Sequence, residues 1–310
     1  FISRMWKKLC FVACFSSDAA AGSPPDGYVL MPSGYFHSDC VHQWEEHVDI
    51  ADLPNNHTTV TFPNGTSILL PPCLHSPIRK RHRQSSPGAV LETVGTDSAA
   101  DGMYYSGWVA YAGYTNPQEY TFMTNTWTVP PPPPKYLFIT TIFFFNGMEE
   151  QLHNTSVIIQ PVLQYGRSGC GGGNYWSFAS YSVSGSGRAH CGSKHNTQEG
   201  NVLRGNMTKL ASGGWQIDTE DLTANTKSTV TSTPQKPLLF ACLTLEGIVV
   251  YNCQAFPGNS NVTFTNNYLA DPKGEIKAVP WTKYVMHKEC NQTVNIASNA
   301  DVTISYNSGS

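Results

Sequence analysis

The chain has 310 residues, of which 40% are hydrophobic, 12% aromatic and only 13% charged, and its formal net charge is −3. Soluble proteins carry about 25% charged residues on average, so this chain has roughly half the usual share. This composition excludes a disordered charged chain and a helical bundle, and it provides no basic field for nucleic acid. The 26 glycines and 21 prolines indicate a protein rich in β-strands and turns.

The first residues have the pattern of a secretory signal peptide. Two lysines, Lys7 and Lys8, precede an apolar run at 9–15, and small residues follow at 19–21. We therefore expect residues 1–27 to be a leader, with a short apolar strand as the alternative. The apolar run is shorter than the ~20 residues that cross a bilayer, so we expect no membrane span.

Six Asn-x-Ser/Thr sequons support export, because such sites are glycosylated in the secretory pathway. We expect a secreted, extracellular glycoprotein. The acceptor residues are Asn56, Asn64, Asn154, Asn206, Asn261 and Asn291.

The cysteines fit the same compartment. Nine are present, and loss of the leader removes Cys10 and Cys14. Connectivity does not follow from sequence, so pairing of sequence neighbours is the simplest assumption. This assumption leaves Cys290 unpaired. The expected pairs are Cys40–Cys73, Cys170–Cys191 and Cys242–Cys253. No Cys/His set has zinc spacing, so we expect no metal site.

A basic cluster divides the chain. It consists of Arg79, Lys80, Arg81 and Arg83, and a flexible polar stretch follows it. In a secreted protein, such a loop is what a kexin-type or furin-type processing protease cuts. We expect residues 28–84 to be an irregular propeptide-like segment and residues 85–310 to be the mature domain. A solvated surface loop and a heparin or nucleic-acid patch are the alternatives.

The region after the cluster is expected to be all-β. Short runs rich in β-branched and aromatic residues alternate with Gly, Pro, Asn and Ser. About ten strands in this length predict a two-sheet antiparallel β-sandwich of the jelly-roll type. The expected strands cover residues 107–114, 120–129, 136–145, 157–165, 174–183, 202–210, 215–218, 227–230, 238–250 and 261–268.

Two of these strands contain conspicuous polar residues. Gln160 and Gln164 interrupt an apolar strand and point to the same face, because side chains alternate with period two. Glu246 is a lone carboxyl in another apolar strand, and burial would raise its pKa. A carboxyl with a raised pKa suits acid–base catalysis. The alternative is a polar residue on the solvent face of a half-exposed strand.

Six short motifs, in this order, resemble those of the glutamic peptidases of the eqolisin type. They are GWVA at 107–110, NTWTVP at 125–130, FFNG at 144–147, VLQYG at 162–166, NYWS at 174–177 and ACLTLE at 241–246. The resemblance implies a concanavalin-like sandwich, an N-terminal propeptide and acid endopeptidase activity. Asn146 stands where the family has Asp, and Cys242 stands where it has Glu.

The resemblance also implies roles for individual residues. Glu246 would be the general base and Gln164 the oxyanion stabiliser, with Gln160 as the alternative to Gln164. A peptide or protein would be the substrate, and no cofactor would be needed. Substrate-binding roles would fall to Trp127, Asn146, Tyr175 and Trp176.

A second function remains open from the sequence. The same sandwich would serve as a non-catalytic secreted binding module for a glycan or a cell-surface ligand, because fold alone does not decide function. The two functions differ in one geometric requirement. A peptidase needs the side chains of Glu246 and one glutamine to converge on one cleft.

Overall fold

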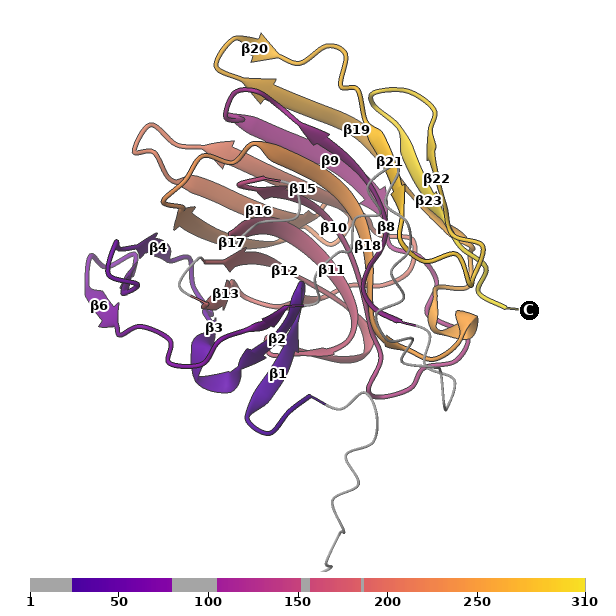
Figure 1. Ribbon diagram of the computed structural model, residues 1–310, viewed down its shortest axis with the longest axis horizontal. Helices are drawn as coiled ribbons and strands as arrows, with labels where there is room; N and C mark the ends of the chain where they lie inside the picture. The colour runs from indigo at the N-terminus through magenta and orange to yellow at the C-terminus, as the bar shows by residue number, and fades with distance from the viewer. Residues whose placement is uncertain (1–23, 80–104, 152–156, 185–186, 310) are drawn as a thin grey trace, which may run out of the picture.

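The computed structural model describes residues 24–79, 105–151, 157–184 and 187–309, and in these residues the protein is all-β (Figure 1). Strands dominate, and the helical turns are the short 3₁₀ segments η1 (Ser38–Cys40) and η2 (Cys253–Ala255). The predicted fold class is therefore confirmed. Within the described ranges, no helix is long and apolar enough to cross a membrane.

The first sheet has nine strands, and only its β13–β3 pair is parallel. Its order is β21 (Thr282–Val285), β8 (Tyr105–Thr115), β18 (Phe240–Val250), β10 (Thr141–Glu149), β11 (Ile158–Ser168), β12 (Gly171–Val183), β13 (Ala189–Cys191) and β3 (Val41–Gln43), with β14 (His195–Asn196) beside β12.

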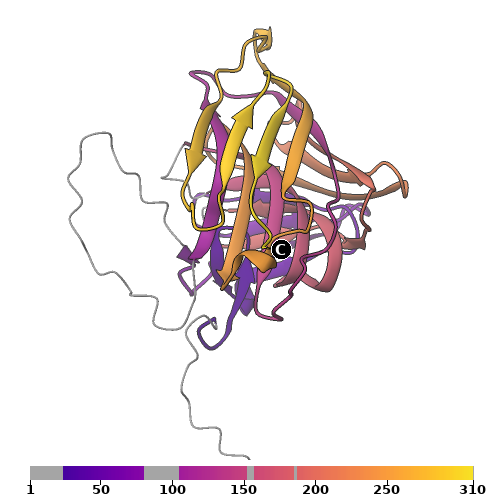
Figure 2. The same ribbon diagram turned by 90° about the vertical axis from the view of Figure 1, so that its right-hand side faces the viewer.

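The second sheet has eleven strands, and only its β17–β4 pair is parallel. Its order is β22 (Thr293–Ile296), β23 (Val302–Ser305), β19 (Asn261–Asp271), β9 (Phe122–Thr128), β15 (Val202–Lys209), β16 (Trp215–Asp221), β17 (Thr226–Thr233), β4 (Asp49–Asp52), β5 (Thr58–Thr61) and β6 (Ser67–Leu70), with β20 (Gly274–Glu275) beside β19. Figure 2 shows β22 and β23, the yellow C-terminal strands, side by side at the end of this sheet that is opposite β6.

A third sheet of three strands lies outside the sandwich. It consists of β1 (Tyr28–Met31), β2 (Gly34–His37) and β7 (Ile78–Arg79). Residues 24–79, the N-terminal segment, therefore contribute to all three sheets. Their strands β3 and β4 cover the edges of β13 and β17, which otherwise would present unpaired backbone groups.

Two apolar clusters hold these layers together. The inter-sheet core fills the space between the two large sheets and contains Phe144, Leu163 and Trp215. The outer cluster lies on the opposite face of the first sheet and contains Phe143 and Phe145 together with residues of the β1–β2 hairpin. Strands β10 and β18 are buried at every position because both of their faces are covered.

The ten strands expected from the sequence are all present, with shifted ends. Strand β10 begins at Thr141 rather than at residue 136, because the preceding residues form the turn after the proline run. The N-terminal segment, expected to be irregular, instead forms seven short strands. These strands have two to four residues each, which is too short for a clear alternating pattern.

The disulfides were predicted in part. Cys40–Cys73 and Cys170–Cys191 are confirmed, whereas Cys242–Cys253 is wrong. Cys253 pairs with Cys290, and Cys242 is a buried free thiol. Cys242 lies near the start of β18, and the eight following strand residues carry the chain about 26 Å away from it at ~3.3 Å per residue. None of the three disulfides joins the N-terminal segment to the rest of the chain.

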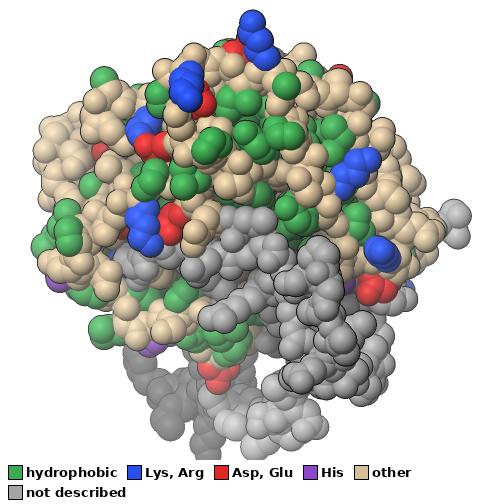
Figure 3. Space-filling model, turned by 45° about the horizontal axis from the view of Figure 1, so that its top comes forward, with side chains coloured by type: hydrophobic (Ala, Val, Ile, Leu, Met, Phe, Trp, Pro, Cys, Tyr) green, Lys and Arg blue, Asp and Glu red, His purple; other side chains and the backbone are tan. Residues whose placement is uncertain are grey.

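The surface agrees with the charge balance of the sequence. Figure 3 shows Lys and Arg side chains beside Asp and Glu side chains in small separate groups on the face it presents. Two of the described ion pairs are Arg204–Glu220 and Lys236–Glu150. No patch of a single charge sign dominates this face.

Candidate active site

Glu246 and Gln164 lie in one row across the first sheet. Phe143 of β10 pairs with Gln164 of β11 on one side and with Glu246 of β18 on the other. Directly paired residues point to the same face, and Phe143 belongs to the outer cluster. Adjacent strands are about 4.8 Å apart, so two intervals place the two Cα atoms roughly 10 Å apart. Both side chains therefore stand on the outer face and flank one phenyl ring.

Gln160 shares this face but not this row. It pairs with Tyr181, whereas Gln164 pairs with Ser177. Four residues of strand place Gln160 about 13 Å further along β11. Both polar atoms of its amide are buried and have no hydrogen-bond partner among the described residues. The structure therefore brings Gln164, and not Gln160, next to the row of Glu246.

Three hydrogen bonds fix the amide of Gln164. Its Nε2 donates to the carbonyl oxygens of Gly166 at 2.8 Å and Gly171 at 2.9 Å, and its Oε1 accepts from the hydroxyl of Tyr181 at 3.0 Å. Because carbonyls can only accept and the Tyr181 hydroxyl donates here, the two ends of the amide are assigned by their partners.

A glycine makes this arrangement possible. Gly172 has φ +99°, and a Cβ atom at this position would lie 2.1 Å from Nε2 of Gln164. The main chain thus approaches the amide more closely than any residue with a side chain allows. The glycine run at 171–173 is the sequence feature that permits this contact.

Glu246 is fully buried. Its Oε1 accepts a hydrogen bond from the backbone N–H of Ser33 at 2.9 Å, and its Oε2 has no partner in the described part of the chain. Removal from water disfavours the charged carboxylate and raises the pKa of Glu246 to about 8, although the Ser33 hydrogen bond opposes this shift. In this state the carboxyl group is protonated at neutral and acid pH.

The β1–β2 hairpin causes this burial. Ser33 is at the tip of the hairpin with φ 75°, between Met31 and Gly34, which are paired. Side chains on either side of the tip pack against the outer face of the first sheet; they are Leu30, Met31, Tyr35 and Phe36. Figure 1 shows the hairpin in indigo against this sheet. The face that carries Glu246 and Gln164 is therefore occupied by the chain itself.

An apolar cavity remains between this hairpin and the first sheet. It has a volume of about 250 Å³, and its lining includes Leu30 and Tyr35 of the hairpin and Ile139, Arg167 and Val249 of the sandwich. The hairpin therefore covers the face without filling all of it.

The residues expected to bind substrate are distributed differently. Trp127 and Trp176 belong to the inter-sheet core. Asn146 faces the same side, where its Nδ2 donates to the carbonyl of Gly205 in the second sheet. Tyr175 is 40% exposed. The structure does not bring the two tryptophans or Asn146 to the face of Glu246, because period-two alternation does not reveal which face of a strand meets the other sheet.

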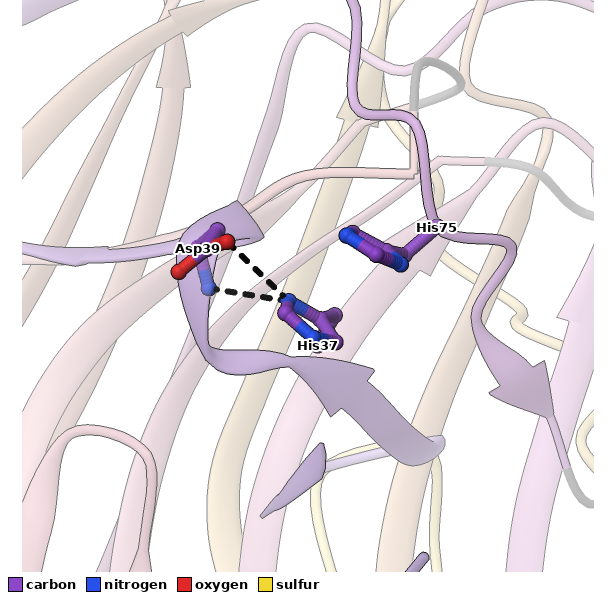
Figure 4. A group of neighbouring side chains, drawn as sticks. All are labelled: His37, Asp39 and His75. Atoms are coloured by element: carbon purple, nitrogen blue, oxygen red, sulfur yellow. Dashed lines mark hydrogen bonds and ion pairs between the residues drawn. The ribbon is translucent and has the colours of Figure 1, made fainter. Parts of the chain in front are cut away.

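One group of His and Asp side chains comes close enough together to be considered for a metal among the residues described (Figure 4). The rings of His37 and His75 stack with centroids 3.5 Å apart and planes inclined by 13°, and Asp39 lies 3.5 Å from Nδ1 of His37. A metal ion lies near the plane of each imidazole that binds it. Two nearly parallel planes at this separation share no such point, so the group does not form a metal centre in this arrangement.

The remaining predicted sites can be located only in part. Arg79 ends β7, whereas Lys80, Arg81 and Arg83 lie outside the described residues, as do Asn154 and residues 1–23 of the leader expected at 1–27. Asn206 is half-buried on β15. The other sequon asparagines are exposed; they are Asn56, Asn64, Asn261 and Asn291.

Comparison with known proteins gives matches among solved structures alone. No protein-family model and no curated protein matches the chain. Scytalido-glutamic peptidase with a peptide-based transition-state analogue is 14% identical, with 66% of this chain and 99% of that chain covered and a TM-score of 0.49. SCP-B, a member of the eqolisin family in complex with the tripeptide Ala-Ile-His, is also 14% identical, with the same coverage and a TM-score of 0.47.

A third similar structure is aspergilloglutamic peptidase from Aspergillus niger. It is 15% identical, with 54% of this chain and 98% of that chain covered and a TM-score of 0.38. These three structures are glutamic peptidases, the family that the sequence motifs resemble.

Proposed function

We propose that this chain is the precursor of a secreted acid endopeptidase of the glutamic type. Its N-terminal segment would keep the site closed. The observation that carries this proposal is the row of Glu246, Phe143 and Gln164 beneath the β1–β2 hairpin. A carboxyl and an amide on one face, separated by a single side chain, are the two groups that water-mediated peptide hydrolysis without a metal needs.

The reaction begins once the hairpin has left. Water then reaches Glu246, its pKa falls from the raised value, and the ionised carboxylate takes a proton from a water molecule. That water attacks the carbonyl carbon of a peptide bond. Glu246, now protonated, gives the proton to the leaving amine, so the group ends the cycle as it began.

Gln164 supplies the charge stabilisation. Its Nε2 would donate to the oxyanion of the tetrahedral intermediate, an effect worth about 3–4 kcal/mol for one good donor. In the closed state both Nε2 hydrogens are bound to the carbonyls of Gly166 and Gly171. One of these bonds must therefore open in the active state, while Tyr181 continues to hold Oε1.

The disulfide pattern supports a removable segment. Cys40–Cys73 lies within residues 24–79, and the other two disulfides lie within the sandwich. Cleavage at the basic cluster that begins with Arg79 would leave the segment attached by non-covalent contacts alone. Residues 28–84 would then be a propeptide, and residues 85–310 would be the mature enzyme.

Secretion completes the proposal. Three disulfides are typical of an oxidising compartment. The leader at 1–27 and the exposed sequons add to the same conclusion. The substrate would be a peptide or an unfolded protein.

The test is casein digestion near pH 3–4 by the secreted chain after cleavage at the basic cluster. The proposal expects proteolysis and a new N-terminus directly after the cluster in N-terminal sequencing. The variant Gln164→Ala should lose at least a hundredfold in rate, and Gln160→Ala should lose little. Absence of proteolysis at every acid pH, or an intact junction in secreted material, would contradict the proposal.

The alternative of a glycan-binding module lacks a platform in the described residues. Exposed aromatic side chains that stack on sugar rings would be required. The exposed ones are Phe138, Tyr175 and Tyr268, and they lie on a loop, on β12 and on β19 respectively. Because β12 and β19 belong to different sheets, Tyr175 and Tyr268 do not share a sheet face.

A further inference from the structure

Besides the hairpin, a group of polar contacts connects the N-terminal segment to the sandwich. It consists of His42, Trp44, Arg188 and His190 and is called the joint below. His42 of β3 pairs with His190 of β13 in the parallel ladder, and their ring centroids are 5.3 Å apart. The indole of Trp44 stacks beside both imidazoles. Arg188, which precedes β13, is buried and contacts His42 and the carbonyl of Pro71. Two histidines and one guanidinium thus lie together, with His190 and Arg188 buried and His42 half-buried.

Hydrogen bonding requires both histidines to be neutral. A guanidinium has only donors, so Nε2 of His42 accepts from Nη1 of Arg188 at 2.8 Å and carries no proton. The indole N–H of Trp44 likewise donates to Nδ1 of His190 at 3.3 Å. Protonation of either ring removes the acceptor and breaks its bond. The joint therefore requires unprotonated imidazoles for geometric reasons alone.

Burial and charge act in the same direction. Burial is the larger cause that lowers the pKa of His42, and the charge of Arg188 adds to it. Burial also lowers the pKa of His190 well below its ordinary value, with further contributions from His42 and Arg188. One acidic group faces Arg188 from the segment, namely Asp52 of β4. Burial raises the pKa of this carboxyl, so Asp52 takes up its proton at a higher pH than an exposed aspartate does.

We propose that this joint is an acid-sensitive latch, which holds the N-terminal segment on the sandwich at neutral pH and releases it when His42 and His190 become protonated beside Arg188. The release itself is independent of any enzymatic activity. Its consequence, exposure of Glu246 in an acid compartment, rests on the proposed function.

The sign of the pH effect follows from proton counts. A released histidine binds protons below about pH 6.5, while a docked one does not until its lowered pKa is reached. Each histidine therefore weakens docking by up to tenfold per pH unit in that interval. Glu246 and Asp52 have raised pKa values and act in the opposite sense, because the docked state holds their protons more firmly. The contribution of Glu246 ends near pH 4.5, where the released carboxyl is protonated as well.

The experiment is hydrogen–deuterium exchange of the full chain between pH 7 and pH 3, corrected for the intrinsic pH dependence of exchange. Every protein carries Glu246→Gln, which removes the opposing carboxyl and prevents self-digestion. The latch predicts that amides of β3 and β4 lose at least tenfold more protection on acidification than amides of β9 and β15. It also predicts that the pair His42→Gln and His190→Gln abolishes this difference.

A matched control and a second variant keep the test decisive. His57→Gln changes a histidine of the same segment whose ring contacts only Asn55 within its own loop among the described hydrogen bonds, and it should leave the transition unchanged. If the double variant has no native protection at pH 7, His42→Gln alone replaces it and should move the transition to lower pH. An acid transition equal in the histidine variant and in its parent overturns the latch, as does the absence of any transition. Neither result depends on whether the chain is a peptidase.

Discussion

The backbone N–H of Ser33 donates to Oε1 of Glu246 at 2.9 Å, although 213 positions separate the two residues in the chain. This single contact connects the tip of the N-terminal hairpin to the carboxyl that the proposed chemistry requires. It also explains the chemical state of that carboxyl, because the hairpin excludes water and the pKa of Glu246 rises to about 8. The same hairpin therefore blocks the face and keeps its acid protonated.

The raised pKa of Glu246 predicts how stability depends on pH. The folded chain holds this proton up to about pH 8, whereas the unfolded chain releases it near pH 4.5, so stability falls as the pH rises between these values. From pH 6.5 to 8 we expect a loss of about 2 kcal/mol, since one pKa unit is about 1.4 kcal/mol. Urea unfolding measures it, and Glu246→Gln should flatten the slope in this interval; an equal slope in both proteins would contradict the assignment.

Gly172→Ala should disturb Gln164 directly. The new Cβ would lie 2.1 Å from Nε2, and the positive φ adds strain. Gly213→Ala is the matched control, because Gly213 has a similar φ of +90° and no atom within 4 Å of the added Cβ. We expect Gly172→Ala to lower the free energy of unfolding by about 1–3 kcal/mol more than Gly213→Ala does. If thermal unfolding shows the same loss of stability for both variants, the close approach of Gly172 to Gln164 does not contribute to stability.

Tyr181→Phe should remove a hydrogen bond that holds the amide of Gln164 and leave the aromatic ring in the core. The phenol is fully enclosed and donates a hydrogen bond to Oε1 of Gln164. We expect a loss of about 1–2 kcal/mol in stability from the unpaired oxygen. In the cleaved enzyme, kcat should fall by a larger factor than KM changes. Tyr114→Phe removes a comparable bond to Asn116 and serves as the control, for which kcat should be unaltered.

The disulfide map predicts the reactivity of each thiol. Cys253 and Cys290 are bonded, and Cys242 is a buried free thiol. Among these three residues, alkylation of the native protein should therefore label none, and alkylation after unfolding without reductant should label Cys242 only. Peptide mass spectrometry reads the result. Replacing Cys290 with Ala should cost about 2–4 kcal/mol, whereas labelled Cys290 in the unreduced protein would refute the pairing.

The sequence was informative where the chain is strongly patterned. Glu246 and Gln164 stood out because each interrupts a long apolar strand, and both lie on the outer face of the first sheet. The burial of this face by the N-terminal segment was not predictable from the sequence. The strands of that segment are short, and they pair with strands far along the chain, as β3 does with β13. The positions of Trp127 and Trp176 depended on which face meets the second sheet, a property of tertiary packing.

The most direct measurement compares casein hydrolysis at pH 3.5 by the chain cleaved at its basic cluster with hydrolysis by the same cleaved chain carrying Glu246→Gln. Glu119→Gln is the matched control, since Glu119 forms an ion pair with Lys209 in the second sheet, away from the row of Glu246. We predict that the wild type and the Glu119 variant digest casein at similar rates and that the Glu246 variant is inactive. Equal digestion by all three would contradict it, because Glu246 would then not be the catalytic base.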